Sequence, residues 1–272
     1  MSTFLFKSSP KNPTVNLSGY PILNCSLAQL KLNSKFLIST INQYSYVIAE
    51  KDAEFKRSLL GSDALLADGV GVVAAVKLLR GKSIKKIAGA DLHQHLLEKL
   101  NAEGGSCFYL GSKESTLEAI KTRLAKEYPN VKVGVYSPPY KAQFTAQENT
   151  EMIDTVNAFK PDVLFVGMTA PKQEKWSYMN KEQLDAKIIC PIGAVFDFYA
   201  ETITRPSQFW VNLGLEWFIR LVKEPKRMSK RYLYYGPAFV FAILKMKVAS
   251  MFNRNNDDNL DATGKKHYAV AN

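Results

Sequence analysis

Short apolar runs alternate with amphipathic stretches through most of this chain, and this alternation limits the possible folds more than any other feature. The stretches Glu114–Tyr128 and Gln147–Phe159 have apolar residues at the roughly 3.6-residue spacing of a helix. Runs such as VLFVG and KIIC are apolar throughout, as strands buried on both faces must be. We expect strands at Phe36–Ile41, Ala64–Ala67, Ser106–Leu110, Lys132–Tyr136, Asp162–Val166 and Lys187–Pro191. Alternating strands and helices predict an α/β fold with a largely parallel sheet, and Val15–Leu23 adds a hairpin or edge strand.

The strand pattern ends near Arg205, which suggests three parts. We expect an α/β core over residues 1–204, a helical, basic and aromatic appendage over 205–252, and a flexible polar tail over 253–272. Pro225 and Pro237 are expected to interrupt the appendage helix. Its most apolar run, Gly236–Leu244, has about nine residues, whereas a membrane-spanning helix needs about 20. We therefore expect this run to lie in a membrane interface and not to cross the membrane.

The charge of the chain points to an anionic partner. Of its 272 residues, 36 are Lys or Arg and 25 are Asp or Glu, which gives a net charge of +11. Six basic residues and one acid lie between Arg220 and Arg231, flanked by tryptophan, phenylalanine and tyrosine. Such a segment can be a solvated charged face. It also suits a membrane interface, where rings sit at headgroup depth and cations meet phosphates, and nucleic-acid binding uses the same ingredients.

Residues that would indicate a metal or a redox cofactor are not grouped in a suitable way. Cys25, Cys107 and Cys190 are far apart and have no metal-type spacing, and the latter two lie in apolar, core-like runs. His93 and His95, two residues apart on a helix, do not share a face. No Asp-x-Asp pair precedes residue 253, and the chain has neither a Walker A motif nor a Gly-x-Gly-x-x-Gly fingerprint. We expect no metal site, no cofactor and a reducing, cytoplasmic setting.

Candidate binding residues lie where strands end, because ligands of open α/β sheets bind outside the carboxyl ends of the strands. Gly111 in YLGSKES ends one strand before a helix, and Gly167 ends another in VGMTAPKQEKW, before Lys172 and Gln173. Glycine lets a ligand approach the backbone, and a helix N-terminus offers N–H groups to a phosphate. The alternatives are an ordinary strand-to-helix turn and a solvated lysine.

Three polar residues at strand ends are candidates for chemistry. Asp68 follows an apolar strand and precedes Gly69 and an apolar helix. It could cap the helix, which its position alone favours, or act as a general base toward a substrate. Thr40 and Asn42 are two residues apart at a strand end, so their side chains share a face, and their simpler role is turn chemistry.

Taken together, the motifs LLADGVGVV, AGADL, FYLGSKES, DVLFVGMTAPKQEKW, GAVFDFYAETITRP and LGLEWFIRLVKEPKR resemble those of the bacterial WecG/TagA/CpsF glycosyltransferase family, over roughly Val15 to Arg231. The resemblance implies a Rossmann-like α/β domain with a C-terminal appendage that contacts the membrane. It implies inverting, metal-independent transfer of a sugar from a UDP-sugar to a polyprenyl-diphosphate-linked glycan. The expected setting is peripheral, at the cytoplasmic face of the bacterial inner membrane, in the synthesis of exopolysaccharide, capsule or teichoic acid.

The resemblance also implies roles for individual residues. Asp68 matches the catalytic base, and Thr40 and Asn42 match an acceptor-binding pair. Arg220, Arg227 and Arg231 match the appendage arginines that hold the lipid diphosphate. The donor side is assigned to Gly111, Gly167, Lys172, Gln173, Gly193 and Asp197.

Two departures from the family pattern leave the identities of the sugars open. Gln43 and Tyr44 follow Asn42 where Pro-Glu or Ala-Glu is usual, and Gly193 is followed by Ala194 and not by a second glycine. The competing hypothesis is a non-catalytic basic module that binds RNA or anionic lipid. Asp68, Thr40 and Asn42 favour the enzyme, because anion binding has no use for a carboxylate at that place. We therefore expect no nucleic-acid partner, and a homo-oligomer stays compatible with the sequence.

Overall fold

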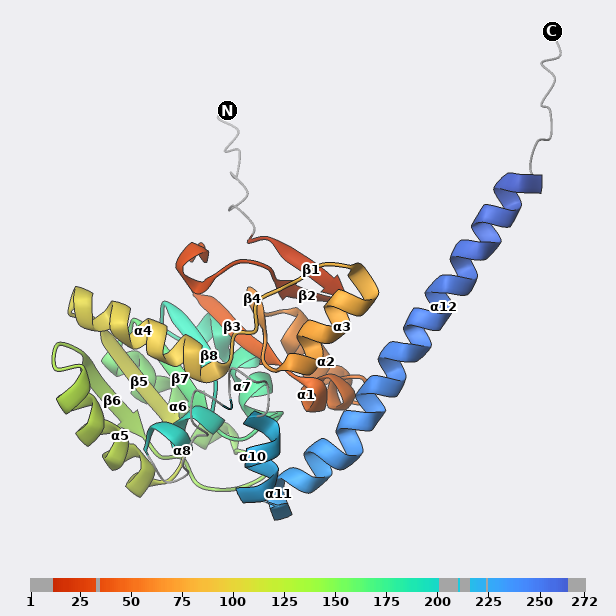
Figure 1. Cartoon of the computed structure of the whole chain (residues 1–272). Coiled ribbons are helices and arrows are strands. Elements are labelled where there is room, and N and C mark those ends of the chain that lie inside the picture. The colour runs from red at the N-terminus through yellow and green to blue at the C-terminus, as the bar shows by residue number, and fades with distance from the viewer. Residues whose placement is uncertain (1–11, 33–34, 201–209, 211–215, 224, 264–272) are drawn as a thin grey trace, which may run out of the picture.

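A computed structural model describes residues 12–32, 35–200, 210, 216–223 and 225–263 of the protein. One eight-stranded sheet, in the order β1-β2-β4-β3-β8-β7-β5-β6, forms its centre (Figure 1). Apart from the antiparallel hairpin β1–β2, neighbouring strands are parallel, which confirms the predicted largely parallel α/β sheet. The strands are β1 Thr14–Leu17, β2 Tyr20–Leu23, β3 Phe36–Ile41, β4 Ala64–Ala67, β5 Ser106–Gly111, β6 Lys132–Tyr136, β7 Val163–Gly167 and β8 Ile188–Pro191.

Helices cover both faces of this sheet, so alternate side chains of a central strand enter different cores. In β7, Val163 and Phe165 pack with α4, α5 and α8, whereas Leu164 and Val166 pack with α6 and α7. This arrangement explains why the run VLFVG is apolar at every position. The helices of the core are α1 Gln43–Ala49, α2 Ala53–Leu60, α3 Val70–Arg80, α4 Gly89–Glu103, α5 Glu114–Glu127, α6 Ala146–Phe159, α7 Lys172–Asn180 and α8 Ala194–Tyr199, with short 3-10 turns η1 at Leu27–Gln29 and η2 at Lys181–Gln183.

The C-terminal segment is helical, as predicted, and its first helix ends before Pro225, where an interruption was expected. It consists of α10 Glu216–Lys223, α11 Pro225–Ser229, a π-helical turn η3 at Lys230–Tyr234, and α12 Tyr235–Thr263. The segment stays helical through Pro237, the third residue of α12, and the π-helical turn η3 directly precedes that helix. The helix continues past Phe252, where the tail was expected to begin, to Thr263. The expected boundary at 204/205 and residues 264–272 lie outside the described residues.

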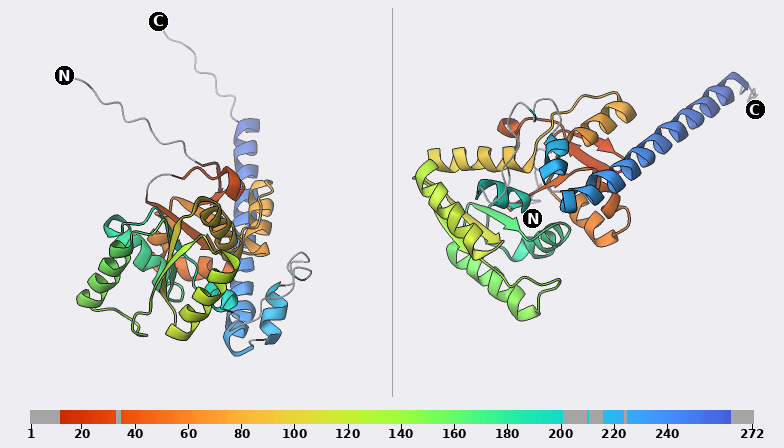
Figure 2. Two further views of the ribbon diagram at one scale, coloured as in Figure 1. Left: turned by 90° about the vertical axis from the view of Figure 1, so that its left-hand side faces the viewer. Right: turned by 60° about the horizontal axis from the view of Figure 1, so that its bottom comes forward.

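Helix α12 packs on the core through one face and projects beyond it (Figures 1 and 2). Phe239 and Ile243, which are 2% and 4% exposed, enter the core that α1, α2 and α3 form with the β1–β2 hairpin. By length and composition, Lys230–Phe252 is able to cross a membrane, with a mean hydropathy of 1.2. The expectation that the apolar run is too short to span is therefore corrected, because apolar residues continue on both sides of Gly236–Leu244.

Candidate active site

A cavity of about 1560 Å³ lies at the carboxyl ends of the parallel strands β3 to β8. Each of these six strands, or the loop directly after it, contributes residues to the wall, as expected for a ligand site in an open α/β sheet. The cavity collects residues that the sequence analysis proposed for both substrates: Thr40, Asn42, Asp68, Gly111, Gly167, Lys172, Gln173, Gly193, Asp197 and Arg231.

Asp68 does not cap the helix that follows it. Its backbone N–H donates to the carbonyl oxygen of Ile41 at 2.9 Å, which extends the pairing of β4 with β3. The N-cap of α3 is Gly69, at a φ of 122°, which favours glycine, and no side-chain cap bond is formed there. The N-cap position thus falls on Gly69 and not on Asp68, whose partly exposed side chain lines the cavity.

Thr40 and Asn42 line the same cavity as Asp68. Asn42 is also the N-cap of α1, because its Oδ1 accepts the backbone N–H of Ser45 at 3.0 Å. The simpler role in turn chemistry is thus present for Asn42. The same bond holds the Asn42 side chain in a fixed orientation at the cavity wall.

Three glycines at the strand ends are required by close packing. Gly111 has a φ of 106°, and a Cβ there would lie 2.4 Å from the carbonyl oxygen of Gly167. A Cβ on Gly167 would lie 2.6 Å from the ring of Phe196, and one on Gly193 would lie 2.4 Å from Oε1 of Gln173. These contacts bring the ends of β5, β7 and β8 together in the cavity floor. Their roles toward a donor stay predictions.

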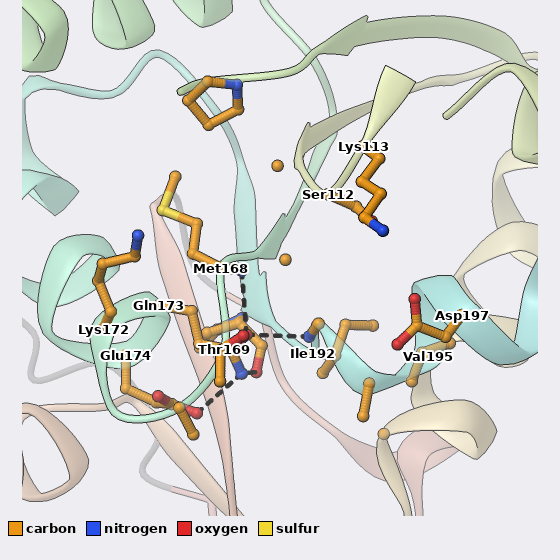
Figure 3. Close-up of a pocket in the computed structure, with 18 of the residues that line it drawn as sticks. Ser112, Lys113, Met168, Thr169, Lys172, Gln173, Glu174, Ile192, Val195 and Asp197 are labelled. Carbon is orange, nitrogen blue, oxygen red and sulfur yellow. Dashed lines mark hydrogen bonds between the residues drawn. The ribbon is translucent and has the colours of Figure 1, made fainter. Parts of the chain in front are cut away.

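Gln173 ties the ends of β7 and β8 together (Figure 3). Its Oε1 accepts the backbone N–H groups of Met168 at 3.3 Å and Gly193 at 3.1 Å. Its Nε2 donates to the carbonyl oxygen of Pro191 at 3.2 Å and to Oε1 of Glu174 at 2.9 Å. Gln173 therefore lines the cavity, as predicted for a pocket residue, while its side-chain amide forms hydrogen bonds to other groups of the protein.

Lys172 and Asp197 border the cavity from opposite sides, on α7 and α8 (Figure 3). The Lys172 Nζ donates to the carbonyl oxygen of Lys141 at 2.8 Å and lies 4.4 Å from the ring centroid of Phe144. Partial burial lowers the pKa of Lys172. Lys172 therefore attaches α7 to the loop between β6 and α6, and it is not the freely solvated lysine of the alternative interpretation.

Glu174, which the sequence analysis did not select, lines the cavity and is 4% exposed. Burial raises the pKa of its carboxyl to about 7, against the opposing effects of the Gln173 bond and the positive Arg231. An acid in the first turn of a helix is ordinarily exposed to solvent and stabilised by the helix dipole. The residue type and position of Glu174 therefore did not indicate a buried cavity residue. The buried face of α7 is polar, since it contains Gln173, Ser177 and Asn180. Apolar periodicity therefore could not reveal it.

Arg231 reaches the cavity from the C-terminal segment. Its guanidinium group lies 4.4 Å from the ring centroid of Tyr44, and Tyr44 also packs edge-on against Tyr235 at 5.0 Å. Tyr44, one of the two departures from the family pattern, lines the cavity and attaches the segment to α1. Arg220 lies on α10 and Arg227 on α11, and their side chains lie outside the described part of the structure.

His93 is a core residue. Its Nε2 lies 2.6 Å from the hydroxyl of Tyr109, and burial lowers its pKa to about 3, so the ring is neutral. Cys107 and Cys190 are buried in the same core, as predicted. Within the described residues, no group of three or more His, Cys, Asp or Glu side chains is arranged to hold a metal ion.

A carboxylate, a glycine-flanked helix start and a cationic residue from the C-terminal segment meet at one strand-end cavity, a combination that is typical of an active site. A sequence model of the Glycosyl transferase WecG/TagA/CpsF family matches residues 15–252, and the chain belongs to this family of glycosyltransferases.

Two named enzymes align with most of the chain. It is 30% identical over 209 residues to the N-acetylglucosaminyldiphosphoundecaprenol N-acetyl-beta-D-mannosaminyltransferase of Bacillus subtilis (strain 168), covering 77% of this chain and 79% of the relative. It is 28% identical over 221 residues to the enzyme of the same name from Bacillus spizizenii (strain ATCC 23059 / NRRL B-14472 / W23), covering 81% and 83%.

Proposed function

We propose that the protein transfers a sugar from a UDP-sugar to N-acetylglucosamine on a polyprenyl diphosphate, with inversion and without a metal, in the synthesis of a cell-surface polysaccharide. One observation carries this proposal: Asp68, Thr40 and Asn42 line the same cavity as the β5–α5 turn, Asp197 and Arg231. A base, an anion-binding turn and a cation are the three groups that such a transfer needs. The names of both relatives support this acceptor, and N-acetylmannosamine is the first donor sugar to test.

Asp68 is the proposed base. Its carboxylate takes the proton of an acceptor hydroxyl while the hydroxyl oxygen attacks the anomeric carbon of the donor. The bond from that carbon to the UDP oxygen breaks, and UDP leaves with the electron pair. Attack from the face opposite the leaving group inverts the configuration. Thr40 and Asn42, the N-cap residue of α1, line the same cavity and position the acceptor for this attack.

The turn between β5 and α5 is the proposed site for the departing diphosphate. Lys113, the N-cap of α5, makes no side-chain cap bond, and Ser112 to Ser115 line the cavity. The first N–H groups of a helix stabilise an anion that gains charge in the transition state. This arrangement supplies the role that a metal has in other sugar-nucleotide enzymes. Gly111 and the strand-end glycines Gly167 and Gly193 let the strand ends pack closely beneath this turn.

The C-terminal segment is the proposed contact with the lipid acceptor. Arg231 lies at the cavity, and Arg220 and Arg227 precede it on α10 and α11. Guanidinium groups recognise phosphate by charge-assisted hydrogen bonds. The stacking of Arg231 on Tyr44 holds one of these cations beside the acceptor residues.

The exposed face of α12 supports peripheral binding to the cytoplasmic face of the membrane. Its buried stripe, with Phe239 and Ile243, packs in the core, and this contact favours a helix that lies on the membrane over one that crosses it. The opposite stripe is apolar and exposed: Val240, Phe241, Leu244, Val248, Met251 and Phe252. A helix with one docked face and one apolar outer face fits a position in the plane of the membrane interface.

A UDP-release screen tests this proposal. The purified protein is incubated with several UDP-sugars, UDP-N-acetylmannosamine among them, and a short-chain polyprenyl-diphosphate N-acetylglucosamine. Release of UDP that requires both substrates supports the proposal. Retention on RNA, with no UDP release and no UDP binding, would support the non-catalytic module instead.

A further inference from the structure

Glu174 has one carboxylate oxygen that the protein does not use. Oε1 accepts the amide of Gln173 at 2.9 Å. Among the described residues, two buried side-chain polar atoms lack a hydrogen-bond partner, Oε2 of Glu174 and Oγ of Ser177, one turn apart on α7. Of these two residues only Glu174 lines the large cavity. A buried carboxylate oxygen without a protein partner is more costly than a hydroxyl in the same position, so we expect a bound group to supply a partner for Oε2.

The surroundings of Glu174 limit what that oxygen can bind. Arg231 acts on Glu174 electrostatically, which places the carboxylate near the acceptor side of the cavity. A carboxylate oxygen accepts hydrogen bonds and repels phosphate. In its ionised form it is therefore a poor partner for the diphosphate of either substrate, and the polyprenyl chain has no donor to offer. Hydroxyl and acetamido N–H groups of a sugar ring are the donors that remain, together with the nucleoside of UDP.

We propose that Glu174 is a specificity-determining residue, whose Oε2 accepts a hydrogen bond from a hydroxyl or amide N–H of the sugar ring held at the reaction centre. This inference rests on the proposed function. It differs from the role of Asp68, because Glu174 holds a group that does not react. Such a contact is made equally in the ground state and the transition state, so it affects KM and leaves kcat nearly unchanged. A site built to bind a hydroxyl also discriminates strongly against a substrate that lacks it.

The variant Glu174→Gln tests the proposal, and Ser177→Ala is its matched control. The glutamine keeps the size of the side chain and the bond to Gln173 but turns an amide N–H toward the cavity. We expect KM for one sugar substrate to rise about 10- to 100-fold, with kcat within a few-fold and the Kd for UDP alone unchanged. The substrate whose KM rises, UDP-N-acetylmannosamine or the lipid-linked acceptor, identifies the sugar. Ser177→Ala should leave both KM values unchanged.

Three outcomes overturn the proposal. A fall in kcat at constant KM would make Glu174 part of the proton transfer. A weaker Kd for UDP would assign it to the nucleoside, and wild-type constants in the variant would leave it a structural role. If Glu174→Gln does not fold, monodeoxy sugar substrates with the wild-type protein replace it, and one of them should show the same rise in KM. Absence of turnover by the wild-type protein would refute the proposed function, whereas turnover with an unaffected variant would refute only this inference.

Discussion

The buried carboxyl of Glu174 should make the stability of the protein depend on pH in a calculable way. Its pKa is raised from the ordinary value of 4.5 to about 7 in the folded state. Between these two values the folded protein keeps a proton that the unfolded chain releases, so the free energy of unfolding falls as the pH rises. Because one pH unit is worth about 1.4 kcal/mol, the full effect is about 3 kcal/mol.

The variant Glu174→Gln removes this titration. Relative to the wild type, it should gain about 3 kcal/mol of stability as the pH is raised from 4 to 8. At about 2 to 4 °C per kcal/mol for a chain of this size, the difference between the two melting temperatures should change by about 6 to 12 °C. Thermal unfolding of both proteins without substrates, at several pH values, measures it. Ser177→Ala should follow the wild type, and a difference that does not vary with pH would refute the burial of an ionisable Glu174.

Three further predictions concern the metal, the acceptor and the membrane. Activity should survive EDTA, and complete loss that Mg²⁺ or Mn²⁺ restores would contradict the metal-free mechanism. Tyr44→Leu should raise KM for the lipid acceptor about 3- to 10-fold, the scale of a lost cation–π contact, with donor KM unchanged; equal effects on both substrates in a steady-state assay would argue against it. Replacing Phe241 and Leu244 by serine should reduce co-sedimentation with anionic liposomes, while serine at the exposed Leu60 on α2 should not, and equal retention of both variants would exclude α12 as the membrane contact.

Much of the fold could be predicted from the sequence because its strands are uniformly apolar and clearly bounded. The bounds of β3, β4 and β6 agree with the expected ranges, those of β5 and β8 differ by one residue at one end, and β7 is shifted by one residue at both ends. The C-terminal helix was predicted less well. Pro237 was expected to interrupt it, but the chain stays helical through this residue, with a π-helical turn just before it, and the polar residues after Phe252 do not end the helix.

The cavity residues at strand ends were predictable for a topological reason. Parallel strands end at the same edge, so Thr40, Asn42 and Asp68 had to lie close together once the sheet was known. Glu174 and Tyr44 could not be found in this way. The importance of Glu174 depends on the burial of a polar helix face, and that of Tyr44 depends on contact with Arg231, far away in the sequence. Neither the burial of a polar helix face nor a contact between distant residues produces a periodic or local pattern in the sequence.

The turnover of Asp68→Asn, measured beside its affinity for UDP, tests the central claim most directly. The claim predicts that the variant binds UDP as the wild type does, because the nucleotide is assigned to the other side of the cavity. With UDP-N-acetylmannosamine and the lipid-linked acceptor, UDP release should fall by about 10² or more, the scale of a lost general base. Turnover within a few-fold of the wild type would contradict the assignment of Asp68 as the base and of this cavity as the place of sugar transfer.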